Sequence, residues 1–173
     1  DLIGVAAGRG LRVGAVALDD PEDAVGINTR VHLAETEAIM RRRINKEWME
    51  AGVTMIDPAT TLIEPDVTLA PDTVIWPNTQ LIGETKIGGS CVIGPNTLIR
   101  DSRIGDGCKI VASVIEQATV ENKVDIGPYA HLRRGAHLAS GVHVGNFGEV
   151  KESYLGPGAK MGHFSYIGNA RIG

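Results

Sequence analysis

The chain has 173 residues, a formal net charge of −4 and a hydrophobic content of 43%. The length suits one ordinary domain with a piece of another, and the apolar content excludes intrinsic disorder. The negative charge argues against nucleic acid as a partner, and no apolar run approaches the ~18 residues of a membrane span.

The first 30 residues join a helix-like stretch, "DLIGVAAGRG", to an apolar stretch, "LRVGAVAL", that is typical of a buried strand. "DDPEDAVGIN" follows as turn and loop. The strand finds no partner strand in this sequence, so we interpret residues 1–30 as the end of a larger domain. The missing initial Met and the abrupt ending "ARIG" also indicate a piece of a longer protein.

Residues 31–51 are predicted to form one charged helix that links two domains. Asn28 or Thr29 can cap its start, and Gly52 can end it. Its large apolar side chains recur at a spacing of four and therefore share one stripe: Met40, Ile44 and Trp48.

From residue 54 onward, aliphatic residues recur every six positions in two long series. The first series is Ile63, Leu69, Ile75, Leu81, Ile87, Ile93 and Ile99; the second is Val120, Ile126, Leu132, Leu138, Val144 and Val150. Five-residue steps separate and follow the two series, and a small residue stands two positions before most aliphatics. A period of six fits neither a helix nor a continuous strand, but it is typical of a β-solenoid.

Each coil of this solenoid has three short sides, so about 110 residues make roughly six coils, stacked at ~4.8 Å. We expect the aliphatic residue of each side to point inward and glycine to occupy the corners. Cys91 and Cys108 fall in the small inward position of adjacent coils. Their spacing permits a disulfide, but we expect two free, buried thiols in a reducing cytoplasm.

Several motifs now resemble a known family: "GINTR" before a charged helix, "AGVTMIDPATT", "IGPYAHLRRGAHL", "HVGNFGEVK" and "GAKMGHFSYIGNARIG". The chain is similar, over nearly its whole length, to the bacterial bifunctional N-acetylglucosamine-1-phosphate uridyltransferase/glucosamine-1-phosphate acetyltransferases. The resemblance implies a homotrimer of mainly-β subunits. Residues 1–30 would end a Rossmann-like α/β uridyltransferase domain, 31–51 would form the linker, and 52–173 would be an incomplete left-handed parallel β-helix acetyltransferase domain.

The resemblance also implies an activity for the full-length protein. Acetyl-CoA would acetylate glucosamine 1-phosphate, and UTP with Mg²⁺ would then give UDP-N-acetylglucosamine for peptidoglycan and lipopolysaccharide precursors. The uridyltransferase's Gly-rich nucleotide loop and metal-binding aspartate are absent here, and so are the later coils that hold acetyl-CoA. We therefore expect this piece to be inactive alone.

The matching motif positions assign roles to individual residues. His163 of "GHFSY" would be the general base, and Arg133 and Lys151 would bind the phosphate of glucosamine 1-phosphate. Tyr166 would also contact this substrate. Asn28 of "GIN" would help to hold Mg²⁺ and the nucleotide sugar.

The repeat predicts where these side chains stack. Arg133 and Lys151 are 18 residues apart with no shortened step between them, so they should lie one above the other on one face. Two adjacent cations repel each other, and a phosphate dianion relieves that repulsion. The next step is shortened, which predicts two further stacked pairs: His163 over Asn146, and Tyr166 over Glu149.

Other functions of the same fold remain open. A carbonic anhydrase needs three histidines around zinc, but His131, His137 and His143 are spaced by six and fall on three different faces. Another hexapeptide acyltransferase, acting on a sugar or a lipid-A precursor, is a nearer alternative. A non-catalytic β-helix that only assembles a nucleotidyltransferase is the third.

Overall fold

The computed structural model describes residues 2–173, which form two units, one ending at Ile39 and the other running from Met40 to Gly173. The first unit contains helix α1 (Leu2–Gly8), the 3₁₀ helix η1 (Pro21–Ala24) and the start of helix α2 (Arg30–Glu50). Residues 11–18 form no strand, and Val16 is 90% exposed. The predicted buried strand is therefore wrong for this chain, because a strand needs a hydrogen-bonded neighbour and an apolar layer to cover it.

Helix α2 has the ends that its sequence predicted. The Thr29 hydroxyl accepts a hydrogen bond from the backbone N–H of His32 at 3.1 Å, which caps the start. Gly52, with φ of 95°, follows the end. Ile44 and Trp48 of the predicted apolar stripe pack against the core of the second unit, whereas Met40 is 45% exposed.

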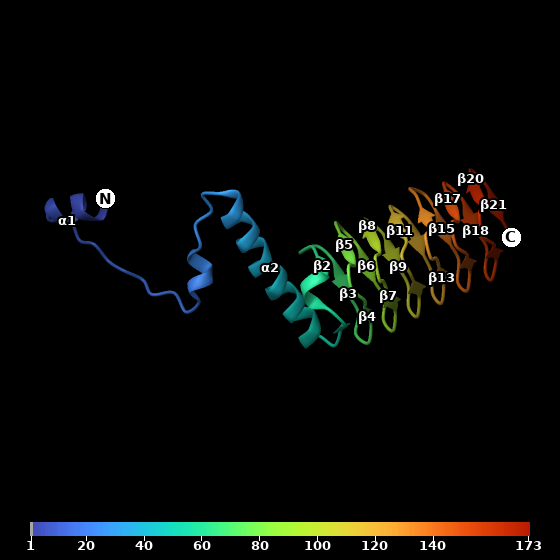
Figure 1. Ribbon diagram of the computed structural model, residues 1–173, viewed down its shortest axis with the longest axis horizontal. Helices are drawn as coiled ribbons and strands as arrows, with labels where there is room; N and C mark the ends of the chain where they lie inside the picture. Colours follow the sequence, from blue (N-terminus) through green and yellow to red (C-terminus); the bar gives the residue numbers. More distant parts are fainter. Residues whose placement is uncertain (1) are drawn as a thin grey trace. The chain divides into compact units, whose positions relative to one another are not determined.

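The second unit is a parallel β-solenoid with three sheets, and successive coils follow one another from green to red in Figure 1. Sheet A contains β1 (Thr54–Met55), β4 (Val74–Ile75), β7 (Val92–Ile93), β10 (Lys109–Ile110), β13 (Asp125–Ile126), β16 (His143–Val144) and β19 (Lys160–Met161). Sheet B contains β2 (Leu62–Ile63), β5 (Gln80–Ile82), β8 (Leu98–Arg100), β11 (Val114–Glu116), β14 (His131–Leu132), β17 (Glu149–Lys151) and β20 (Tyr166–Gly168). Sheet C contains β3 (Thr68–Leu69), β6 (Lys86–Ile87), β9 (Arg103–Ile104), β12 (Thr119–Val120), β15 (His137–Leu138), β18 (Tyr154–Leu155) and β21 (Arg171–Ile172).

The architecture is the left-handed β-helix that was expected, but it has about seven coils rather than six. The shortened steps make some coils smaller: Ile99 pairs with Ile115, only 16 residues later. The ladder also starts early, at β1, and the 3₁₀ helix η2 (Pro58–Thr60) lengthens that first coil. The smaller coils and the early start together place an additional coil in the same region of sequence, even though η2 makes the first coil longer.

The core consists of the aliphatic residues that the six-residue period selected. Ile75, Leu81, Ile93 and Ile99 are fully buried, and burial of one such side chain stabilises a fold by about 1.5–3 kcal/mol. The small residues two positions earlier are buried as well. Their hydroxyls bond to the backbone, as the Thr73 hydroxyl does to the carbonyl of Gly88 at 2.8 Å.

Glycine occupies some corners, as predicted, for example Gly107, Gly141 and Gly158 with φ between 65° and 74°, but more of the left-handed residues in the described solenoid are not glycine. Asp101, Glu152 and Asn169 are among the non-glycine residues with φ between 44° and 52°. Hydrogen bonds between coils hold these conformations, as from the N–H of Asn169 to the carbonyl of Lys151 at 3.1 Å. Elsewhere glycine permits close approach: a Cβ on Gly148, which occupies an inward small position, would lie 2.8 Å from a methyl of Val144.

Cys91 and Cys108 are free and buried, as predicted. Their thiols donate to the carbonyls of Gly105 and Glu121 at 3.1 and 3.0 Å. The hydrogen bond with Cys91, together with burial, raises the pKa of Cys108. Among residues 2–173, no helix combines the length and apolarity that crossing a bilayer requires.

Candidate functional site

The outer face of sheet B carries Arg133 and Lys151 side by side, as their spacing predicted. Strand β14 pairs with β17 so that Leu132 lies beside Val150, and the N–H of Arg133 donates to the Val150 carbonyl at 2.9 Å. Strand β17 in turn places Lys151 beside Gly168 of β20. We call these three neighbouring positions, 133, 151 and 168, the site column.

The charge of Arg133 is compensated by Glu149, a contact that was not predicted from the sequence. Its Nη1 donates to the Glu149 carboxylate at 2.8 Å, and this contact raises the pKa of the guanidinium. Lys151 is half-buried and has no ion pair within residues 2–173. The two cations therefore do not face each other uncompensated, but Arg133 keeps further N–H donors for a ligand.

Tyr166 stacks over Glu149 as predicted, and its hydroxyl turns toward the site column. A Cβ added at Gly168 would collide with the Tyr166 hydroxyl, so the phenol lies across the space that any other residue would fill. Because Gly168 is the register partner of Lys151, the Tyr166 hydroxyl joins the column that contains both cations. The many glycines of this stretch were visible in the sequence, but the sequence did not show that Gly168 leaves space for the Tyr166 hydroxyl.

His163 lies at the corner between β19 and β20, one coil beyond Asn146. Its side chain is exposed, and within the described chain neither ring nitrogen makes a hydrogen bond. The predicted stacking with Asn146 therefore sets no tautomer here. The ring contact of the histidine is with Phe164, whose ring is nearly perpendicular at a centroid distance of 5.6 Å.

Asn28 belongs to the first unit and lies in a shallow hollow with Ile27 and Leu33. Its backbone N–H reaches the His32 Nδ1 at 3.4 Å. Mg²⁺ requires about six oxygen ligands, and residues 2–173 contain no group of three acidic, histidine or cysteine side chains that could hold a metal. One amide does not make such a site, so the described residues do not fit a magnesium ion by themselves.

The three histidines of the carbonic anhydrase alternative lie on β14, β15 and β16, in three different sheets. Each faces a carboxylate of the preceding coil. The pairs are His131 with Glu116 at 3.3 Å, His137 with Glu121 at 2.8 Å, and His143 with Asp125 at 2.9 Å. They do not converge within the chain, as their spacing predicted.

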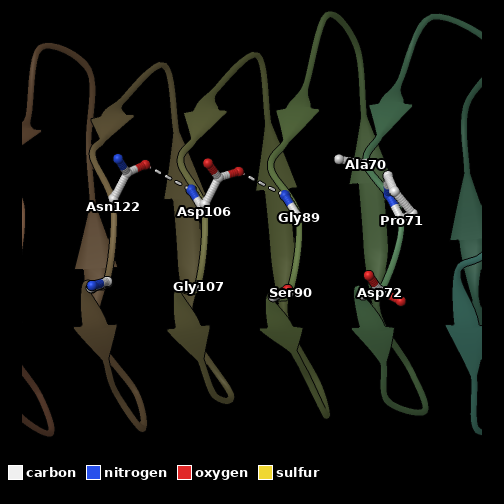
Figure 2. A pocket seen from close by; sticks show the side chains of 9 residues that line it. Ala70, Pro71, Asp72, Gly89, Ser90, Asp106, Gly107 and Asn122 are labelled. Carbon is white, nitrogen blue, oxygen red and sulfur yellow. Dashed lines mark hydrogen bonds between the residues drawn. The ribbon is translucent and has the colours of Figure 1, made fainter.

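A hollow of about 600 Å³ follows a different edge, the corner between sheets C and A (Figure 2). Its polar side chains bind backbone within the wall. The side-chain amide oxygen of Asn122 accepts a hydrogen bond from the backbone N–H of Asp106, and the Asp106 carboxylate accepts one from the backbone N–H of Gly89, both at 2.8 Å. These contacts cap the corners of successive coils and explain the positions of Asp106 and Asn122 without a ligand.

The repeats and the residues on sheet B define a β-helix protein of the hexapeptide-repeat class. No family model matches the chain. The bifunctional protein GlmU of Lactococcus lactis subsp. cremoris is 53% identical over all 173 residues, and that of Exiguobacterium sibiricum is 46% identical. The chain belongs to the GlmU family and spans 38% of the length of these curated relatives.

Solved structures of the same repeat type are more distant. A putative acetyltransferase of Bacillus cereus is 17% identical, with a TM-score of 0.42 over 67% of this chain and 77% of its own. A likeness of that strength adds nothing to the assignment of function, which depends on the family match and the site column.

Proposed function

We propose that this chain carries part of the acetyltransferase site of a bifunctional GlmU protein. The full-length protein transfers acetyl from acetyl-CoA to glucosamine 1-phosphate, then uridyl from UTP to N-acetylglucosamine 1-phosphate. The product, UDP-N-acetylglucosamine, supplies peptidoglycan and lipopolysaccharide synthesis in the cytoplasm. The observation that supports this most is the site column, which Arg133, Lys151 and the Tyr166 hydroxyl share. His163 precedes β20, the strand that carries Tyr166 and Gly168.

Arg133 and Lys151 bind the sugar phosphate. The Glu149 carboxylate accepts a hydrogen bond from the Arg133 guanidinium at 2.8 Å, and Lys151 has no ion pair within residues 2–173. A phosphate dianion that meets both residues gains charge-assisted hydrogen bonds from each. The Tyr166 hydroxyl, across Gly168, offers a third polar contact on the same column.

His163 acts as the general base. The amine of the sugar attacks the thioester carbonyl, the C–S bond breaks, and coenzyme A leaves as the thiol. His163 takes the proton that the attacking nitrogen releases, for which an imidazole near neutral pH is suited. Its exposed ring with unbonded nitrogens is accessible to a substrate.

The remaining assignments concern parts of the family outside this chain. Asn28 contributes to a nucleotide-sugar and Mg²⁺ site whose other ligands come from elsewhere. Acetyl-CoA is the co-substrate of the acetyl transfer. Since the chain spans 38% of its relatives' length, both activities are assigned to the full-length protein, and the isolated chain is inactive.

The active protein is a homotrimer. Apolar side chains are exposed on the earlier coils: Trp76, directly after β4, is 42% exposed, and Val114 on sheet B is 39% exposed. Burying such residues against other copies of the chain removes them from water. Light scattering of the full-length protein should report three subunits, and a monomer at micromolar concentration contradicts the assembly.

Two variants of the full-length protein test the chemistry. His163→Ala removes the proton acceptor, so turnover in acetyl transfer should fall by about 10²–10⁴-fold with little change in KM for glucosamine 1-phosphate. Lys151→Ala deletes a contact made in both ground and transition states, so a raised KM should form a large part of its defect. Thiol release from acetyl-CoA measures both.

Uridyl transfer is the control in the same preparations and should stay unchanged in both variants, because the other domain carries that site. Near-normal acetyl transfer by His163→Ala would show that the histidine is structural. The base would then be a different group.

A further inference from the structure

The corner between sheets A and B is a line of residues, one per coil, that all adopt a left-handed φ. In chain order they are Asn78, Asn96, Ala112, Tyr129, Phe147 and Phe164. The earlier three are polar or small, and the side chains of Asn78 and Asn96 hydrogen-bond at 3.0 Å. The later three are aromatic, and both phenylalanines of the chain are among them.

The three aromatic side chains form a continuous stack, which we call the aromatic ladder. The rings of Tyr129 and Phe147 lie 5.2 Å apart at 21°, and those of Phe147 and Phe164 lie 5.0 Å apart at 4°. The ladder is outside the core, since Phe147 is 47% exposed and Phe164 is 75% exposed. Aromatic rings at the surface of a protein with only 4% aromatic residues call for a reason other than packing of the interior.

The change from polar to aromatic coincides with the candidate site. Tyr129 precedes Arg133 by four residues, Phe147 precedes Lys151 by four, and Phe164 precedes Gly168 by four. Each rung of the ladder therefore belongs to a coil that contributes one position of the site column. Earlier coils, with asparagine or alanine at this corner, form the same sheets without a ladder.

Phe164, the last residue of the aromatic ladder, contacts the proposed general base, His163. Phe164 lies nearly perpendicular to the His163 imidazole, at 84°, with 5.6 Å between ring centroids. Offset stacks and perpendicular pairs are the arrangements that aromatic rings prefer. Within residues 2–173 no hydrogen bond holds the ring nitrogens of His163, and the ring contact that the structure gives its imidazole is the one with Phe164.

We propose that the aromatic ladder positions His163 for proton transfer, with Phe164 in contact with the imidazole and Phe147 holding Phe164 in place. This inference rests on the proposed acetyl transfer. A general base works only when it is held within hydrogen-bond reach of the proton that it removes. A stiff stack beside the imidazole achieves this without occupying its nitrogen atoms, which remain free for the substrate.

A double-mutant cycle in the full-length protein tests the proposal. Phe164→Leu and Phe147→Leu should each lower kcat of acetyl transfer by about 10- to 100-fold, while KM for glucosamine 1-phosphate changes less than about twofold. In the His163→Ala background the same replacements should have no further effect on kcat, because their action passes through the imidazole. Phe164→Tyr should keep most of the turnover, since Tyr129 shows that this corner accepts a tyrosine ring.

Tyr154→Leu is the matched control. Tyr154 makes the same type of contact with another histidine, His137, at 5.1 Å and 88°, but on sheet C. This replacement should leave kcat unchanged. The melting temperature of each variant shows whether the β-helix is folded, and uridyl transfer checks the other domain.

The outcomes separate the two hypotheses. If His163→Ala loses acetyl transfer but the phenylalanine variants keep normal kcat, the ladder proposal is wrong and the base assignment stands. Equal losses of kcat with His163 present and in the His163→Ala background also overturn it, because the ladder would then act on general stability. If His163→Ala itself transfers acetyl normally, the assignment of His163 as the base fails and the ladder proposal fails with it, whereas the proposed function fails only if the full-length wild-type protein transfers no acetyl.

Discussion

Gly168 contributes to the candidate site because its lack of a side chain leaves room for the Tyr166 phenol. Its position in β20 is ordinary strand backbone, and the Tyr166 phenol occupies the space beside it. The flexible end of one side chain is what a methyl group would meet, so a replacement here should move Tyr166 without disturbing the coil.

We predict that Gly168→Ala raises KM for glucosamine 1-phosphate by about tenfold, the order expected for loss of a hydrogen bond to a charged group. The melting temperature should stay close to that of the wild type. Gly162→Ala is the control in the same stretch, because nothing lies within 4 Å of its added Cβ. An unchanged KM in Gly168→Ala would show that the hydroxyl position of Tyr166 does not contribute to binding.

Glu121 carries a second effect at the residue scale, one that depends on pH. The hydrogen bond from His137, followed by that from the Ser140 hydroxyl, lowers the pKa of the Glu121 carboxyl. A depressed native pKa means that the carboxylate stabilises the fold above its ordinary pKa. That contribution is lost as the pH falls through the native value.

Glu121→Gln should therefore lower the melting temperature at pH 7 and make a smaller difference at pH 3. Thermal unfolding of both proteins at the two pH values measures this. Glu84→Gln is the control, since its carboxylate makes no ion pair within residues 2–173. A difference that is the same at pH 3 and pH 7 contradicts the assigned cause.

At the scale of elements, Asn45 joins α2 to the first coil. Its side-chain amide donates to the carbonyls of Pro58 and Thr61 at 2.9 and 3.0 Å, and the residue is 1% exposed. The apolar stripe of the helix was readable from sequence, whereas this polar contact was not, because an asparagine in a charged helix usually faces water. The carbonyls that it meets come from η2 and the residue after it, an irregular turn outside the six-residue period.

We predict that Asn45→Asp lowers the free energy of unfolding by about 1–3 kcal/mol or more, because a carboxylate cannot donate to the two carbonyls. Asn45→Ala should cost a similar amount. Lys46→Ala, on the exposed side of the helix, should change it by less than about 0.5 kcal/mol. Urea unfolding of the three variants measures this, and equal stability of Asn45→Asp and wild type would rule out the anchoring role.

At the scale of the whole molecule, the two units differ in what holds their backbone. Every coil of the solenoid bonds to its neighbours through three parallel ladders around one apolar interior. Residues 11–18 have no ladder, and apolar side chains such as Leu11 and Val16 are 62% and 90% exposed. Local stability should therefore be very uneven along the chain.

Hydrogen exchange of the 173-residue chain should show amides between Ile126 and Val144 exchanging at least roughly a thousandfold more slowly than those between Val13 and Leu18. The solenoid amides are bonded between coils, and the others face solvent. Similar rates in both segments would mean that residues 11–18 have found a partner surface in solution.

The repeat could be predicted from the sequence because it depends only on the spacing of residues along the chain. One aliphatic residue per side, a small residue two positions before it and a shortened step after Val150 were enough to place Arg133 beside Lys151 and Tyr166 beside Glu149. These pairings follow from counting along a chain in which each coil repeats the previous one.

Only the tertiary structure decided the interactions that no repeat encodes. Glu149 neutralises Arg133, the Tyr166 hydroxyl covers Gly168, and Phe164, the last ring of an aromatic stack, contacts His163. Side-chain rotamers and contacts between coils choose among neighbours that counting along the chain leaves equivalent. The apolar stretch at residues 11–18 is the opposite case, in which the sequence predicted a strand that the structure does not contain. Its strand propensity is local, but a strand exists only where another strand completes its hydrogen bonds, and the described chain provides none.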